Sequence, residues 1–288
     1  MNSDKYLAFS GGSANGIVYV GVYKALYERN IIQSLSGAVG CSIGSFFALM
    51  CCLGIKPDTL YNDIMALDVK KLADDSWCPI IDFEDLVHKL GLCKGKFLLN
   101  WVEHVLERET GIKNITFAQL FKLTGKHLKT VTFNETKVRI EYWDHITQPD
   151  MKVSSAIRAS TSLPVIFEPF RMNGDIFVDG GCGDVFPLES FPDALGIMVM
   201  SAEDEDVNDL VTHVEVKSLQ DHLLALYIGM STILFRLKNK DWVSRTLAVK
   251  GPNKSTWDFT LTQEEKKTFI DKAYKDTLIS VLPLHYNI

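Results

Sequence analysis

Residues 37–53 read GAVGCSIGSFFALMCCL, a short apolar run that meets a serine between two glycines and then continues as a longer apolar run. The first run has the length of a strand, whereas Ile43 to Leu53 is too long for one and predicts a helix. The glycines allow a sharp turn between the two elements. We therefore expect a strand-turn-helix unit centred on Ser42.

The segment before it has the same order of elements. Residues 6–10 are a short apolar run, Gly11 and Gly12 end that run, and residues 16–28 carry apolar side chains at helical spacing. Two strand-turn-helix units in succession predict a parallel sheet covered by helices. The expected fold class is α/β, with a mainly parallel central sheet and helices on both of its faces.

The rest of the chain predicts one further helical block and more strands. Residues 57–126 show helical patterns with charged faces and are expected to form a helical insertion. Residues 128–134 and 138–143 alternate in polarity and predict a β-hairpin, and 197–200 predicts another short strand. Because no repeat or linker is visible, we expect a single domain over residues 1–288.

Composition limits the partners and the compartment. The 288 residues are 47% hydrophobic and carry a net charge of −6, without a basic stripe, which argues against nucleic acid as a partner. The six cysteines form no C-x-x-C pair and are expected to be reduced core residues. No basic segment precedes the first apolar run, so we expect no signal peptide and an intracellular protein, cytoplasmic or peripherally membrane-associated.

The longest apolar stretch, residues 223–235, is shorter than the roughly 20 residues of a membrane-spanning helix, so no transmembrane helix is expected. We interpret it as a buried helix packed on the sheet. The alternative is an interfacial helix that dips into lipid, which would give peripheral membrane contact.

The first chemical motif is the G-x-S-x-G pattern of Gly40, Ser42 and Gly44. This pattern is typical of a nucleophile elbow, in which glycines make room for a sharp strand-to-helix turn and the serine hydroxyl is exposed at a helix N-terminus. The helix dipole there favours the developing alkoxide. Glycine and serine also mark ordinary turns, so the assignment as a nucleophile elbow depends mainly on the flanking strand and helix.

The second motif is the loop Gly11-Gly12-Ser13-Ala14-Asn15-Gly16. Its glycine spacing is like that of a phosphate-binding loop, but Ile17 stands where the lysine of that motif must be. The remaining interpretations are an oxyanion hole made of backbone amides, or simply a tight loop.

The third motif is Asp179-Gly180-Gly181, which follows the apolar run 176–178. An aspartate at the end of a strand is well placed to take a proton from a hydroxyl group or from water. Taken alone, the same residues describe an ordinary turn.

The three motifs, in the chain order glycine loop, G-x-S-x-G and D-G-G, resemble the patatin-like phospholipase family. Three further stretches agree with that family: residues 116–126, the R-A-S-x-x-x-P stretch within Ala156–Pro164, and Asp184 with Pro187, which stand where the family has Asn and Pro after D-G-G. The resemblance covers about residues 5–190, and the region of about 205–288 is less typical.

The resemblance implies a patatin-like α/β domain that hydrolyses ester bonds of lipids or phospholipids without cofactor or metal ion. In this mechanism Ser42 attacks the ester carbonyl, Asp179 is the general base and an acyl-enzyme forms on Ser42, with no histidine. Amides of Gly11, Gly12 and Ser13 would form the oxyanion hole. Asp184 is the nearest competing acid, and its position suggests that it orients its loop through side-chain hydrogen bonds.

One residue departs from the family pattern. Asn15 stands before the last glycine of the first loop, where the family usually has Arg or Lys. A missing positive charge would lower the activity or change the specificity.

Two other interpretations stay open. An α/β-hydrolase esterase would use the same elbow with a Ser-His-Asp triad completed by His213, His222 or His285. A catalytically weak or inactive patatin-like binding protein would keep the fold without turnover, which the replacement at Asn15 makes conceivable.

Overall fold

A computed structural model describes residues 4–67, 71, 88–200, 216–238, 242–252, 261–280 and 282. The predictions that concern Cys78, His213 and His285 lie outside these residues. The five cysteines within them are free thiols, four of them buried.

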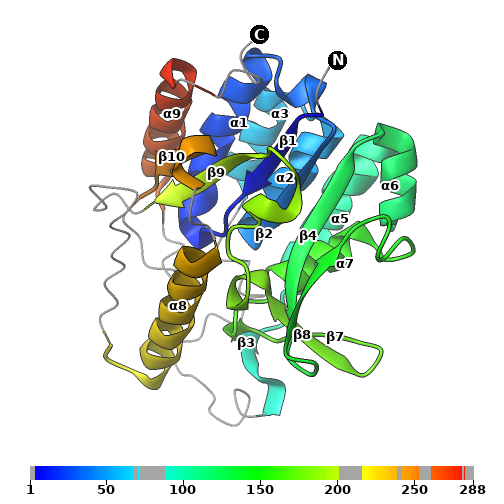
Figure 1. The fold of residues 1–288 in the computed structure, drawn as a ribbon, viewed down its shortest axis with the longest axis vertical. Helices are drawn as coiled ribbons and strands as arrows, with labels where there is room; N and C mark the ends of the chain where they lie inside the picture. The colour runs from blue at the N-terminus through cyan, green and yellow to red at the C-terminus, as the bar shows by residue number, and fades with distance from the viewer. Residues whose placement is uncertain are drawn as a thin grey trace.

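A central sheet organises the molecule (Figure 1), and among the described residues it contains eight strands. Seven of them follow the order β10-β9-β1-β2-β4-β8-β7, while β5 pairs with β4. These strands are β1 (Tyr6–Phe9), β2 (Gly37–Cys41), β4 (His127–Asn134), β5 (Arg139–Trp143), β7 (Phe170–Met172), β8 (Asp175–Asp179), β9 (Leu195–Met200) and β10 (Thr246–Lys250). A separate pair consists of β3 (Gly91–Cys93) and β6 (Val165–Phe167).

The sheet is parallel from β10 through β9, β1 and β2 to β4. Beyond β4 the pairings with β5 and β8, and that of β7 with β8, are antiparallel. The predicted hairpin is therefore confirmed as β4 and β5. The mainly parallel sheet is also confirmed, with an antiparallel portion at one side.

Helices follow the strands along the chain. They are α1 (Tyr19–Glu28), α2 (Ile43–Leu53), α3 (Pro57–Ala66), α5 (Lys96–Thr110), α6 (Phe117–Thr124), α7 (Val153–Ser160), α8 (Leu219–Lys238) and α9 (Gln263–Ile279), with short 3-10 helices at Ser13–Val18, Ile32–Ser34, Gly180–Cys182, Leu188–Ser190 and Trp242–Arg245. In the described part of the predicted insertion, α3, α5 and α6 are helical, and β3 is an addition that the sequence did not suggest.

Two cores lie on opposite faces of the sheet, because successive side chains of a strand point to opposite sides. On β1, Leu7 and Phe9 join the larger core with residues of α1, α2 and α9, whereas Ala8 faces the smaller core. The smaller core is closed by aromatic rings of Phe186, Phe235 and Trp242. Several helices, among them α1, α2 and α9, therefore cover one face of the sheet. The end of α8 and short 3-10 helices cover the other face.

The apolar stretch 223–235 lies in α8 and differs from our expectation of a buried helix. Leu224 and Phe235 are buried, but Leu226, Met230 and Ile233 are at least half exposed. Only one side of α8 packs on the molecule, because the helix lies at its margin, apart from α1, α2 and α9 (Figure 1). Among the described helices, none is both long and apolar enough to cross a bilayer.

The contact between α1 and α9 gives a first prediction. A side chain at Gly21 would collide with the backbone carbonyl of Ile270 on α9, whereas a side chain at Gly229 on α8 would meet nothing. We expect Gly21→Ala to lower the free energy of unfolding by about 1–3 kcal/mol or more, because overpacking forces the helices apart. Gly229→Ala should raise it by up to about 1 kcal/mol, since alanine favours a helix. Urea unfolding of both variants tests this; equal effects would contradict it.

Candidate active site

Ser42 stands at the junction of β2 and α2, where the chain makes a sharp turn. Its φ is 52° and its ψ is −129°, a conformation that favours glycine and costs a serine on the order of 1–3 kcal/mol. The Ser42 amide donates a hydrogen bond to Oγ of Ser160 at 3.0 Å, which ties the turn to the end of α7. The structure thus stores strain at this serine, as a nucleophile elbow does.

The two glycines of the motif explain why the turn is so tight. A Cβ atom at Gly40 would collide with the carbonyl oxygen of Gly44, and one at Gly44 would lie 2.5 Å from the carbonyl oxygen of Ser10. The first turn of α2 therefore lies directly against the backbone of β1 and β2.

Asp179 is the last residue of β8 and reaches the same end of the sheet. Its amide donates to the carbonyl of Ser162, and β8 pairs with β4 so that Asp179 lies opposite Thr132. Its side chain also accepts a hydrogen bond from the Gly181 amide at 2.8 Å, which caps the short helix Gly180–Cys182. The strand and the cap together fix the direction of this carboxyl group.

The Asp179 carboxyl group is buried, with 1% of the residue exposed. Its Oδ1 accepts hydrogen bonds from the Gly181 amide, from the Tyr227 hydroxyl at 3.2 Å and from the Cys41 thiol at 3.8 Å. Its Oδ2 has no partner with hydrogen-bond geometry in the described chain. The Ser42 side chain nevertheless lies near enough to this carboxyl group to lower its pKa.

Burial changes the pKa of Asp179 more than its hydrogen bonds do. Desolvation raises the pKa of Asp179 from its ordinary 3.8 to about 6, although hydrogen bonds from Ser42, Gly181, Tyr227 and Cys41 act in the opposite direction. A carboxylate with this pKa is a stronger base than an exposed one and is still mostly ionised at neutral pH.

The glycine loop passes beside Ser42. A Cβ atom at Gly11 would lie 3.6 Å from Cβ of Ser42, so the loop backbone and the serine are close neighbours. However, the Gly11 amide donates to the carbonyl of Val185 at 2.8 Å. This corrects our expectation that Gly11 donates to an oxyanion. The next amide, that of Gly12, has no acceptor among the described residues.

The later residues of the loop form a 3-10 helix rather than an open loop. Ser13 has a φ of 48°, and the Asn15 amide donates to the Gly12 carbonyl at 3.0 Å. The Asn15 side chain lies against the backbone of Gly251, just after β10. A Cβ atom at Gly16 would collide with Ile43, so this glycine allows the loop and α2 to meet.

Asp184 does not share the surroundings of Asp179. Its buried carboxylate forms an ion pair with Lys238 at the end of α8 and accepts a hydrogen bond from the Tyr142 hydroxyl at 2.6 Å. Its amide donates to the Gly180 carbonyl at 2.8 Å. The side chain therefore ties the loop after Asp179 to β5 and α8.

Two residues of this site were missed by the sequence analysis. Ser160 belongs to the stretch that resembles the family pattern, so that stretch was a usable signal. Tyr227 had no signal, because α8 was interpreted only as apolar. Burial and the nearby Asp179 raise the pKa of Tyr227 well above its usual range, so the hydroxyl is a permanent donor to Asp179.

No described histidine forms a hydrogen bond with Ser42 or Asp179. His222, the one described candidate for a triad, is an exposed residue of the first turns of α8. His127 and His145 instead pack with the ring of Phe121. The described residues also contain no group of three His, Cys, Asp or Glu side chains that could hold a metal ion.

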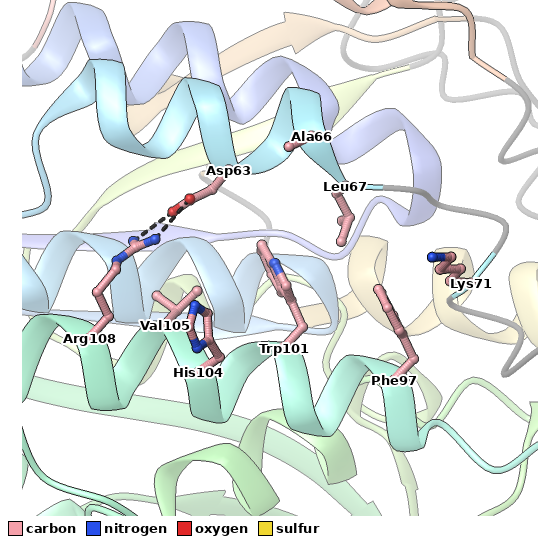
Figure 2. A pocket seen from close by; sticks show the side chains of 9 residues that line it. All are labelled: Asp63, Ala66, Leu67, Lys71, Phe97, Trp101, His104, Val105 and Arg108. Atoms are coloured by element: carbon pink, nitrogen blue, oxygen red, sulfur yellow. Dashed lines mark hydrogen bonds and ion pairs between the residues drawn. The ribbon is translucent and has the colours of Figure 1, made fainter.

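A pocket of about 300 Å³ lies elsewhere, between α3 and α5. Figure 2 shows Phe97 and Trp101 of α5 directed toward α3, and Arg108 paired with Asp63. Neither Ser42 nor Asp179 lines this pocket. It is therefore separate from the site at the elbow.

A mainly parallel sheet covered by helices, with a serine in a strained strand-to-helix turn and a buried aspartate at the same end, defines a mixed α/β protein. Within that class, a family model described as "Patatin-like phospholipase" matches residues 7–192. The chain belongs to the patatin-like phospholipase family.

Relatives were found in viruses and in yeast. The chain is 28% identical to protein R571 of Acanthamoeba polyphaga mimivirus, over 97% of this chain and 94% of that protein. It is 26% identical to the probable lipid hydrolase 463L of Invertebrate iridescent virus 6, over 64% of this chain and 62% of that protein. It is 27% identical to triacylglycerol lipase 5 of Saccharomyces cerevisiae, over 56% of this chain but only 22% of that protein.

Solved structures share the fold. VipD from Legionella pneumophila superimposes with a TM-score of 0.63 at 18% identity, over 96% of this chain and 66% of VipD. ExoU, in its complex with SpcU from Pseudomonas aeruginosa, gives a TM-score of 0.52 at 16% identity, over 96% of this chain and 51% of the ExoU chain. At these identities the likeness establishes the α/β fold alone.

The buried carboxyl group gives a second prediction. Because the pKa of Asp179 is raised on folding, ionised Asp179 costs about 3 kcal/mol of stability above about pH 6, and this cost disappears below about pH 4. We expect Asp179→Asn to be more stable than wild type at pH 8, with an advantage that shrinks toward pH 4. Urea unfolding across this pH range measures the difference.

Asp184→Asn is the control for this experiment. Its carboxylate is buried and paired with the partly exposed Lys238, so removing its charge should destabilise the chain. If the stability difference between Asp179→Asn and wild type does not change with pH, the pKa of Asp179 is not raised by folding.

Proposed function

We propose that this protein hydrolyses ester bonds of lipids through an acyl-enzyme on Ser42, with Asp179 as the general base. The observation that carries the proposal is the buried carboxyl group of Asp179 beside a serine in a strained turn. Membership in the patatin-like phospholipase family and relatives named as lipid hydrolase and triacylglycerol lipase support a lipid ester as substrate.

In the first half-reaction, Oγ of Ser42 attacks the ester carbonyl carbon while its proton moves to the Asp179 carboxylate. Oδ2 is the expected acceptor, because it has no partner in the described chain, whereas Oδ1 already accepts hydrogen bonds from Gly181, Tyr227 and Cys41. The tetrahedral intermediate then collapses. The protonated Asp179 returns its proton to the departing alcohol, and the acyl group stays on Ser42.

Backbone amides would hold the negative charge on the carbonyl oxygen of that intermediate. The Gly12 amide is the best candidate, because it lies next to Gly11, which approaches Ser42, and has no acceptor among the described residues. Ser13 follows it in the same turn. The amides at the start of α2 add the positive end of a helix dipole.

In the second half-reaction, water takes the place of the alcohol. Asp179 accepts a proton from the water, hydroxide attacks the acyl carbonyl, and the collapsing intermediate returns the proton to Oγ of Ser42, releasing the carboxylic acid. One carboxyl group thus acts alternately as base and as acid. A pKa of about 6 suits both roles near neutral pH.

The roles of Ser42 and Asp179 lead to a third prediction. Ser42→Ala and Asp179→Asn should each lower kcat on a lipid ester by on the order of 10³-fold or more, and the double variant should lose no more than either single variant, because the two residues act as a unit. Hydrolysis rates of the three variants test this, with the exposed Ser34→Ala as a matched control that keeps wild-type activity.

Two outcomes would contradict the assignment. Substantial activity in Ser42→Ala would exclude this serine as the nucleophile, and an active Asp179→Asn beside an inactive Asp184→Asn would mean that the base is Asp184. A third possibility is a binding protein without turnover. A fluorophosphonate probe identifies this case, because the probe would not label Ser42 in such a protein.

The fourth prediction concerns pH. The base must be ionised, so activity should rise with pH through a midpoint near 6 and then level off. Because an imidazole titrates in the same range, the profile must be paired with His222→Ala, for which we expect activity within about tenfold of wild type. A folded His222→Ala variant without activity would favour a Ser-His-Asp triad.

A further inference from the structure

The outer face of α8 carries a continuous stripe of apolar side chains. They recur at intervals of four and three residues over the whole helix, and each is between 37% and 66% exposed. This outer stripe consists of Leu219, Leu223, Leu226, Met230, Ile233 and Leu237. An exposed apolar stripe along a whole helix is a candidate for contact with a membrane or with another protein.

The inner face of the same helix contacts residues 179–184, which we call the catalytic loop because it carries Asp179. Tyr227 donates to the Asp179 carboxylate at 3.2 Å, and Oγ of Ser231 donates to the carbonyl of Gly181 at 2.6 Å. At the end of α8, Lys238 pairs with Asp184. The outer stripe is therefore only one helix thickness away from Asp179, the proposed base.

The charge of this segment differs from that of the chain. Because Lys238 pairs with Asp184, the remaining charges between residues 216 and 238 are those of Lys217, Arg236 and Asp221, a net charge of +1, whereas the chain has −6. Cations at the ends of an apolar stripe suit a surface of anionic lipid headgroups.

A helical protein partner fits the stripe less well. In a coiled coil, the positions that flank the apolar seam usually carry paired charges. The flanking positions 220, 222, 227, 229, 234 and 236 contain one fully charged residue, Arg236. Tyr227, moreover, is turned to Asp179.

We propose that the outer stripe of α8 is the surface by which this protein docks on a lipid bilayer, with the catalytic loop held directly behind it. The inference rests on the proposed function, because that function supplies the reason for a lipid surface beside Asp179. Docking there would bring Ser42 and Asp179 to the substrate without a membrane-spanning segment.

The test measures docking apart from turnover. In a Ser42→Ala background, which consumes no lipid, the chain should float with vesicles made of phosphatidylcholine and phosphatidylglycerol in equal amounts. It should bind less to vesicles of phosphatidylcholine alone. Adding Ile233→Glu, and separately Met230→Glu, should lower the bound fraction at least about tenfold, because an ionised side chain then opposes burial in lipid.

The matched control is Ile279→Glu in the same background. Ile279 is also an exposed isoleucine of a helix, at the end of α9, and is 82% exposed. It should float as the parent protein does. Thermal unfolding of each variant confirms that a loss of binding is not a loss of fold.

Three results would overturn the proposal. These are a parent protein that binds neither kind of vesicle, an equal loss of binding in Ile279→Glu, and a dimer in sedimentation experiments that Ile233→Glu dissociates. Failure of the proposed function looks different: the protein with Ser42 intact would bind vesicles through the outer stripe but hydrolyse no lipid ester.

Discussion

The close approach of α2 to the strands beneath it is the constraint on which the rest of the site depends. Without side chains at Gly40 and Gly44, the first turn of the helix lies against the backbone of β1 and β2, and the chain is forced through a positive φ at Ser42. The same approach brings the loop at Gly11 beside the serine. The proposed nucleophile and the proposed oxyanion loop are therefore positioned by close backbone packing, which leaves them little freedom to move.

The electrostatic surroundings of Asp179 are the second determinant of the site. Asp179 lies on a strand from the antiparallel side of the sheet, so Ser42 and Asp179 come from different parts of the fold and meet only in the folded chain. Burial there raises the pKa of the carboxyl group, and hydrogen bonds from Gly181 and Tyr227 keep it from rising further. The site thus holds an ionisable group in surroundings that oppose its charge, a loss of stability that catalytic sites commonly tolerate.

The sequence predicted the parts of the molecule that depend on local patterns. The helix at residues 43–53, the hairpin of β4 and β5 and the strand that ends at Asp179 were all visible as runs and alternations. The contacts of α8 were not visible, because an apolar run does not reveal which side of a helix is covered. That depends on contacts with Asp179, Gly181 and Phe186, which are distant in sequence from the helix. Nor did the pattern reveal that the Gly11 amide is already bonded to Val185.

Truncation of the chain before β9 would expose an interior strand of the sheet. β9 begins at Leu195, after the residues that match the family, yet it pairs with β1 in the interior of the sheet and carries β10 on its other side. A fragment that ended near residue 192 would leave β1, with its apolar Leu7 and Phe9, as an open edge strand. Such edges pair readily with other chains. Pairing with β9 therefore keeps the backbone groups of β1 from being open to other chains.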